Sequence, residues 1–202
     1  PKIAIWDVPS GKVIFQPDDD YKHFCLSPDG TKLYVTKLNE VSNPGVISVI
    51  DMATLKETER FFDLGLYAGS YIAISPDGQT LALAAFKEPN NEYDTKTNQV
   101  YLIDLKDKTK YTVLETFDPQ VNSMEFSPDG KQIAFLHYGQ SLEDVYIYIY
   151  NLETKEKKYI RLDELSALFG IKFYGIGIPS FVDNNTIPFE ISDLSDNHHY
   201  QI

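Results

Sequence analysis

Cysteine, positive charge and long apolar runs are all scarce in this sequence. The 202 residues include one cysteine, Cys25, which excludes an internal disulfide and a metal cluster held by thiolates. No apolar run is long enough to span a bilayer as a helix, so we expect no transmembrane segment. The chain begins with Pro1 and shows no cationic and then apolar leader, which indicates a piece processed or excised from a longer protein.

The charge balance narrows the classes of partner. Lys and Arg number 18 against 30 Asp and Glu, which gives a formal net charge of −12. An acidic surface repels phosphates, so we expect neither nucleic acid nor anionic lipid as a general partner. With 43% hydrophobic and 13% aromatic residues, the chain has the composition of a globular domain with a sizeable core.

A Ser-Pro-Asp-Gly tetrapeptide recurs at residues 27–30, 75–78 and 127–130, and residues 182–185 are a degenerate copy. Proline at the second position presets φ for a type I turn, and glycine at the fourth accepts positive φ. Such a turn joins two antiparallel strands with a bulge. The segments on both sides of each copy are short, rich in apolar residues and bounded by turn residues, as strands are.

A second kind of hairpin occurs four times. One precedes the first tetrapeptide, and one follows each of the three intact copies. Four apolar runs end at Asp7, Asp51, Asp104 and Asn151, and a short polar turn and a strand that opens on Lys come next. The Asp or Asn side chain can accept hydrogen bonds from the backbone of the turn that it opens. The repeating unit is therefore four strands, A to D, in about fifty residues, which is the period of a β-propeller blade.

The predicted fold class is all-β: a β-propeller of four-stranded antiparallel blades, about four of them, in one domain over residues 1–202. The blade repeats are 21–62, 70–114 and 121–162, with 3–15 and 178–191 combined in one mixed blade that would close a ring. Residues 199–202 resemble a further C strand, which would compete with residues 3–6 for one position. We therefore expect a segment of a larger propeller of about six to eight blades rather than a closed ring of four.

Two strands carry a family resemblance. Residues 33–37, Leu-Tyr-Val-Thr-Lys, look like a YVTN strand, and residues 132–135, Gln-Ile-Ala-Phe, are closer to the Tol type. Over nearly its whole length the chain resembles the WD-like propellers of the YVTN and Tol-translocation types. This resemblance implies an exported or cell-envelope protein, and it covers scaffold and binding proteins as well as lactonases and dehydrogenase subunits.

The two ends of the predicted blades differ in regularity. The A–B and C–D turns are short and stereotyped, whereas the B–C and D–A loops at the other end are long and unlike one another. Binding residues concentrate on irregular loops held by a regular scaffold, so we expect a partner at the loop end. The candidate binding residues are the polar, acidic and aromatic residues of that end: Tyr21, His23, Tyr67, Glu92, Tyr93, Asp94, His137 and Tyr138.

Catalytic and metal chemistry find little support. The oxygen-rich loop 88–94 could take calcium, but the alternating ligands of a calcium loop are missing, so we expect no metal or other cofactor. There is no Gly-x-Ser-x-Gly elbow, and the predicted A strands offer only His23 and Glu125 for a channel site. The sequence favours a non-catalytic module that recognises a protein, peptide or glycan. The alternative is a propeller-type enzyme or enzyme subunit, such as a lactonase-like hydrolase.

Overall fold

The structure is a computed structural model, and strands dominate the part of the chain that it describes. Only residues 163, 164 and 167 are helical among those described, and no described helix is long and apolar enough to cross a membrane. The described residues are 3–16, 21–37, 47–61, 67–87, 97–117, 120–138, 145–161, 163–164, 167, 173–176, 180–187, 190–193 and 199–201.

Three four-stranded antiparallel sheets form the centre of the molecule, and we call them blades 1, 2 and 3. Each follows chain order from strand A to strand D, as the repeat predicts. Blade 1 is β3 (Tyr21–Leu26), β4 (Lys32–Lys37), β5 (Ile47–Asp51) and β6 (Lys56–Phe61). Blade 2 is β7 (Tyr67–Ile74), β8 (Thr80–Lys87), β9 (Thr97–Asp104) and β10 (Tyr111–Phe117). Blade 3 is β11 (Gln120–Phe126), β12 (Gln132–Tyr138), β13 (Val145–Asn151) and β14 (Lys157–Arg161).

The two ends of the chain lie in separate sheets, so the mixed blade of residues 3–15 and 178–191 is not what the structure shows. Strands β1 (Ile5–Asp7) and β2 (Lys12–Phe15) pair with each other. Strands β15 (Phe173–Ile176), β16 (Glu190–Asp193) and β17 (His199–Gln201) form a three-stranded sheet. The physical reason is the competition noted above, because β17 takes the C position beside β16.

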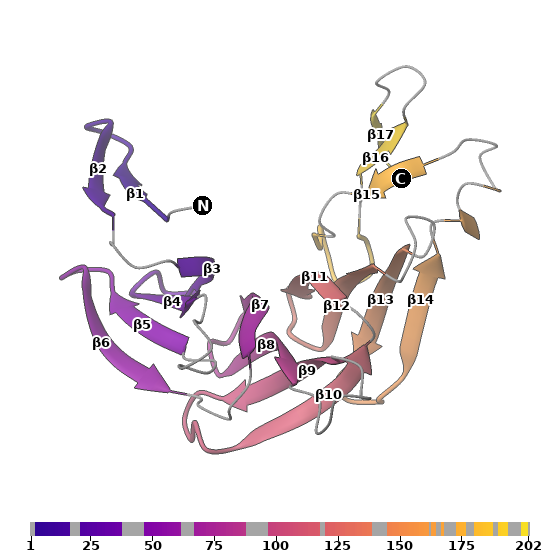
Figure 1. The fold of residues 1–202 in the computed structure, drawn as a ribbon, viewed down its shortest axis with the longest axis horizontal. Coiled ribbons are helices and arrows are strands. Elements are labelled where there is room, and N and C mark those ends of the chain that lie inside the picture. The colour runs from indigo at the N-terminus through magenta and orange to yellow at the C-terminus, as the bar shows by residue number, and fades with distance from the viewer. Residues whose placement is uncertain are drawn as a thin grey trace.

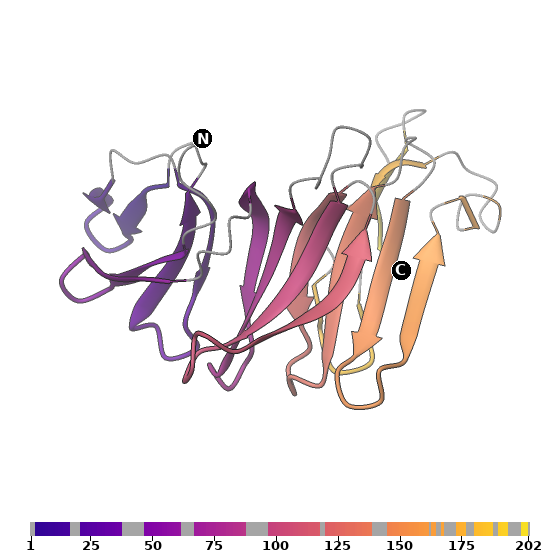
Figure 2. The same cartoon turned by 60° about the horizontal axis from the view of Figure 1, so that its bottom comes forward.

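The sheets stand side by side in an arc, with β3, β7 and β11 innermost (Figure 1). These first strands contact one another from blade to blade, and the later strands of each blade fan outward. Figure 2 shows the described turns of the three blades gathered at one end. All-β, propeller-like blades are thus the architecture, as the sequence predicts.

Hydrophobic side chains fill the space between neighbouring blades. Because successive residues of a strand point to opposite faces, Leu81 and Leu83 of β8 pack toward blade 1, while Ala82 and Ala84 pack toward blade 3. The hairpin β1–β2 packs on blade 1 in the same way, through Ile5 and its neighbours. The middle strands are therefore buried on both faces, which explains their nearly continuous apolar sequence.

The tetrapeptide turns have the predicted geometry. Gly30, Gly78 and Gly130 adopt φ of 72°, 69° and 71°, and each backbone N–H donates to the carbonyl oxygen of the Ser three residues earlier, at 2.8 Å. The serine adds a role that the repeat alone does not reveal. Ser27 Oγ donates to Asp29 at 2.6 Å and accepts from the Lys32 backbone N–H at 2.9 Å, so it ties the turn to the next strand.

The C–D turns are also as predicted. Asp51 accepts hydrogen bonds from the backbone N–H and the hydroxyl of Thr54, at 2.8 and 2.7 Å. Asn151 accepts from the backbone N–H of Thr154 at 2.8 Å. These side chains saturate backbone donors that the tight turn leaves without a partner.

Candidate functional site

The loop end of the inner strands brings together side chains from three blades. The rings of His23 on β3 and Tyr71 on β7 are tilted by 42° with their centroids 4.2 Å apart. Tyr138, at the end of β12, lies near enough to raise the pKa of Tyr71 electrostatically, although burial is the larger cause of that rise. We call His23, Tyr71 and Tyr138 the inner cluster. Two of its members are predicted binding residues.

Tyr71 is the member that the sequence analysis missed, although the repeat holds a signal for it. His23 and Tyr71 both lie four residues before the Ser of a tetrapeptide, Ser27 and Ser75. Equivalent positions on neighbouring inner strands face the same channel, so aligning the repeats would have paired them. Ser123 occupies this position in blade 3 and is buried.

The other predicted binding residues lie elsewhere. Tyr21 is 3% exposed and packs in the core cluster under the β1–β2 hairpin, so its side chain is not presented at the surface. His137 is buried against Tyr146 and Tyr148 of β13, with ring centroids 5.9 and 6.0 Å away. Tyr67 begins β7, where only its backbone is described, and Glu92, Tyr93 and Asp94 lie outside the described residues.

The chemistry of the described ionisable groups is mainly structural. No three His, Cys, Asp or Glu side chains of the described residues converge as a metal site would require. Burial raises the pKa of Cys25 to about 12, so this thiol is a core group and a poor nucleophile at neutral pH. Glu125 accepts a hydrogen bond from the Phe181 backbone N–H at 3.3 Å.

The carboxylates of the tetrapeptide turns have lowered pKa values. The Ser27 hydroxyl is the largest cause for Asp29, and the Thr31 backbone and hydroxyl add to it, which brings the pKa of Asp29 to about 2. The pKa values of Asp77 and Asp129 are lowered in the same way, first by Ser75 and Ser127. Hydrogen bonds to the charged form explain the direction in all three.

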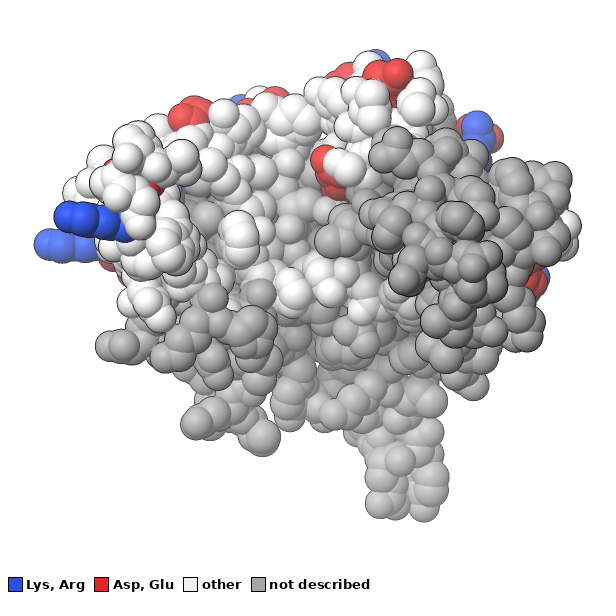
Figure 3. All heavy atoms as spheres, turned by 90° about the horizontal axis from the view of Figure 1, so that it is seen from above, with Lys and Arg blue, Asp and Glu red and all other residues white. Residues whose placement is uncertain are grey.

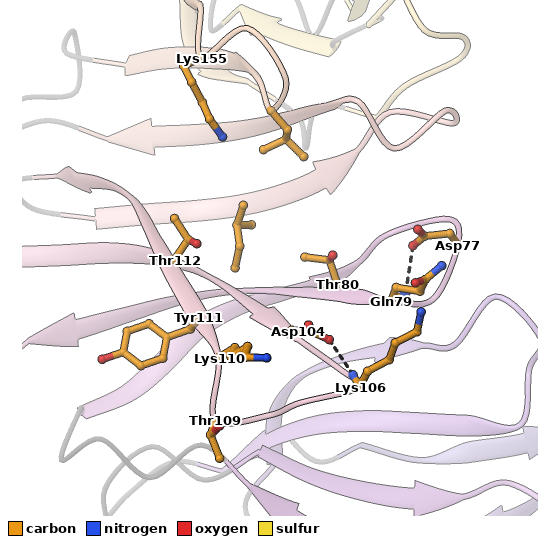
Figure 4. A pocket seen from close by; sticks show the side chains of 12 residues that line it. Asp77, Gln79, Thr80, Asp104, Lys106, Thr109, Lys110, Tyr111, Thr112 and Lys155 are labelled. Atoms are coloured by element: carbon orange, nitrogen blue, oxygen red, sulfur yellow. Dashed lines mark hydrogen bonds between the residues drawn. The ribbon is translucent and has the colours of Figure 1, made fainter.

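Three hollows of the described residues lie toward the turn end of the blades. One lies between the inner strands and is lined by Cys25, Ile74, Met124 and Phe181, with a volume of about 480 Å³. A smaller one lies between the tetrapeptide turns of blades 1 and 2. The largest, about 840 Å³, is an open groove between blades 2 and 3 (Figure 4). Hollows are therefore present at the turn end as well, although the sequence predicts a partner at the loop end.

Lysine side chains line much of this groove between blades 2 and 3. Lys106 and Lys110 come from the C–D turn of blade 2, and Lys155 comes from the C–D turn of blade 3. Asp77 and Asp104 also line it, but both already accept hydrogen bonds from their own turns, at 3.0 and 2.8 Å from the backbone N–H groups of Gln79 and Lys106. Figure 4 shows Lys155 extending from its turn into the space between the two blades.

The concave side of the arc, seen in Figure 3, carries no single charged patch among the described residues. Their Lys, Arg, Asp and Glu side chains lie mostly around the rim of this view.

Comparison with known proteins supports the fold but does not specify a function. No family model matches the sequence, and no curated protein matches it. Among solved structures, the chain is similar to hydrazine synthase of Kuenenia stuttgartiensis, with a TM-score of 0.65 and 17% identity over 96% of this chain. The chain spans 51% of the length of that structure. In all, 662 chains of solved structures match this fold, which is therefore too widely shared to specify a function.

Proposed function

We propose that this chain is a non-catalytic β-propeller module, built from repeats of the YVTN or Tol-translocation type, that binds a protein, peptide or glycan at its loop end. The observation that carries this proposal is the inner cluster, in which the rings of His23 and Tyr71 from two blades are in contact and Tyr138 of a third blade lies near enough to raise the pKa of Tyr71. Convergence of side chains from separate repeats is what a propeller scaffold offers to a ligand.

The composition of the inner cluster suits recognition. Tyrosine and histidine rings present apolar faces together with polar atoms, and they lose little conformational entropy on contact. His23 and Tyr71 already hold each other in place through their rings, so the surface is preorganised. No three His, Cys, Asp or Glu side chains of the described residues converge at this cluster.

The enzyme alternative rests on the similarity to hydrazine synthase. At 17% identity that similarity concerns the fold, and within the described residues no group of three His, Cys, Asp or Glu side chains converges at the inner cluster. A binding role needs only the surface that is present, and therefore fits the geometry better.

The test is a binding survey with defined probes. The purified chain is applied to an array of immobilised glycans and to a library of immobilised peptides, and each hit is measured by titration calorimetry. We expect at least one probe to bind, and Tyr138→Ala and His23→Ala to weaken it about tenfold or more, as loss of aromatic contacts does. Tyr71→Phe, which keeps the ring, should bind nearly as well as the original chain.

Tyr159→Ala is the matched control, because Tyr159 is an exposed tyrosine on the outer strand β14, away from the inner strands. It should leave binding unchanged. Probes that bind equally well to Tyr138→Ala and Tyr159→Ala would contradict the proposed site. Turnover of a lactone or of a redox substrate that His23→Ala abolishes would favour the enzyme alternative instead.

A further inference from the structure

The groove between blades 2 and 3 differs from its counterpart between blades 1 and 2 at one equivalent pair of positions. In the counterpart, Lys108 of blade 2 reaches across to blade 1, forms an ion pair with Glu59 and lies over the ring of Phe61 at 5.1 Å from its centroid. These contacts close the outer part of that interface. The same contacts are missing one blade further along, where the groove is open.

The register of the strands explains the difference. Glu59 lies opposite Val49 on β5, and Thr112 lies opposite Leu102 on β9. Val49 and Leu102 are both two residues before the Asp that opens the C–D turn, so Glu59 and Thr112 are equivalent. Lys108 and Lys155 both come from the C–D turn of the next blade, although the turn of blade 2 (104–110) is one residue longer than that of blade 3 (151–156). Lys155 and Thr112 line the same groove, so blade 2 offers Lys155 a threonine at the strand position where blade 1 offers Lys108 a glutamate.

The backbone of Lys155 also sets it apart. Its φ is 63°, in the left-handed region that costs a residue with a side chain about 1 kcal/mol. The same turn position in the β1–β2 hairpin is Gly11, which adopts φ of 64° without strain. Leu55 also has a positive φ in blade 1, so turns of this kind require a left-handed residue at this position. A lysine there costs more free energy than a glycine would. The positive φ is therefore a property of the turn, and Lys155→Gly should relieve the strain without disturbing the turn.

We propose that this groove binds an acidic oligosaccharide, with sugar carboxylates held by Lys155 and Lys106. Neither ammonium group forms an ion pair with another residue of the described part, and Asp77, which feels the charge of Lys106, is already hydrogen-bonded to Ser75 and Gln79. Lys110 is paired with Asp107 and contributes less.

The remaining walls favour a sugar over an acidic peptide. The hydroxyls of Thr80 and Thr112 and the amide of Gln79 line the groove and make no side-chain hydrogen bond within the described residues. Such groups exchange hydrogen bonds with sugar hydroxyls, which a run of acidic peptide side chains lacks. Leu102 and Leu152 add a small apolar surface against which the face of a sugar ring can lie. The groove is open and long enough for a short oligosaccharide.

The experiment is calorimetric titration of the purified chain with trigalacturonate at low ionic strength, with maltotriose and triglutamate as comparison probes. We expect trigalacturonate to bind more tightly than either. Lys155→Gly removes the ammonium and relieves the backbone strain, so it should fold at least as stably as the original chain and bind about tenfold more weakly, the loss expected for one charged contact. Lys106→Gln should have a similar effect on affinity.

Thr112→Glu tests the register argument directly. It gives Lys155 the partner that Lys108 has, so it should weaken trigalacturonate binding about tenfold without removing any lysine. Lys108→Gln in the closed interface and Tyr138→Ala in the inner cluster should leave this binding unchanged, which separates the groove from the proposed function at the loop end.

Three outcomes would overturn the proposal. They are no measurable binding of trigalacturonate, equal binding by Lys155→Gly, and tighter binding of triglutamate, which would assign the groove to an acidic peptide.

Discussion

The two complete interfaces between blades share their interior and differ at their outer edge. Between blades 1 and 2, Tyr34, Val49, Leu83 and Ile103 belong to one buried cluster, and the cluster between blades 2 and 3 is built in the same way around Phe135. At the outer edge the first interface is closed by Lys108 and its partners, whereas the second opens into a groove.

This difference shows how a repeat protein gains a site without changing its scaffold. The core positions of each blade must fill space and therefore accept few residue types. A position at the outer edge, such as Glu59 or Thr112, has fewer packing constraints: Glu59 pairs with Lys108 of the next blade, whereas Thr112 offers Lys155 no carboxylate. The predictions below test the shared core first and the distinct edge last.

The largest expected effect comes from the shared core. Phe135 is fully buried and stacks on Tyr148, with ring centroids 5.6 Å apart, so Phe135→Ala should lower the free energy of unfolding by about 4 kcal/mol. Leu83→Ala, in the other interface, should cost about 3 kcal/mol. Urea unfolding followed by fluorescence measures both. If Val113→Ala, at a half-exposed position of β10, cost as much, the assignment of the core would be wrong.

The tetrapeptide turns should respond alike in both interfaces. A Cβ at Gly78 would lie 3.6 Å from Pro28, and one at Gly130 would lie 3.5 Å from Pro76, both ordinary contacts. The cost of Gly78→Ala or Gly130→Ala therefore comes from the positive φ and should be about 1 kcal/mol in each. Thermal unfolding of the two variants checks this. A cost several times larger at one turn would show that the neighbouring blade is packed more tightly there.

Acid should remove the stabilisation that the turn carboxylates give to the folded state. The pKa of Asp29 is about 2 in the folded protein, below its ordinary value, so its charged form stabilises the fold above about pH 4, and this contribution disappears as the pH falls toward about 2. Asp29→Asn should flatten the pH dependence of the melting temperature in this window. Circular dichroism at several pH values measures it. Asp129→Asn, in the corresponding turn of blade 3, should act in the same direction, and an unchanged slope in both variants would contradict this account.

The smallest effect concerns the edge that separates the two interfaces. Glu59→Thr removes the carboxylate partner of Lys108, and because both side chains are partly exposed we expect a loss of about 0.5 kcal/mol. Thr112→Glu should give a gain of similar size by pairing with Lys155. Unfolding in low and high salt tests both, since salt should erase each change. A gain that survives high salt would mean that Thr112→Glu acts by packing and not by charge.

The repeat predicted the scaffold well because its signals are local. Proline and glycine at fixed turn positions, together with the Asp or Asn that opens each C–D turn, specify hairpins through their own backbone preferences and hydrogen bonds. Three blades follow the predicted strand order, and the D strands Lys12–Phe15 and Lys56–Phe61 open on Lys as predicted. The final repeat departs from the prediction, and its strands lie at 173–176 and 190–193. Its degenerate turn lacks the proline and glycine that specify the other hairpins.

The candidate sites were harder to predict. His23 and Tyr138 lie in the inner cluster, but Tyr21 and His137 are buried, because a residue at a strand end can point into an interface as readily as out of it. Polar or aromatic character does not reveal which face of the strand a residue occupies when a bulge shifts the register, as it does between Tyr21 and His23.

What the sequence determined by itself is the blade: its four strands, its two kinds of turn and the apolar faces that must be buried, since each follows from the chemistry of neighbouring residues. Tertiary structure decided which blades meet, that Tyr71 joins His23, and that Lys155 and Thr112 line one groove while Lys108 pairs with Glu59. These pairings join residues about fifty positions apart, and only the stacking of one blade on the next brings them together.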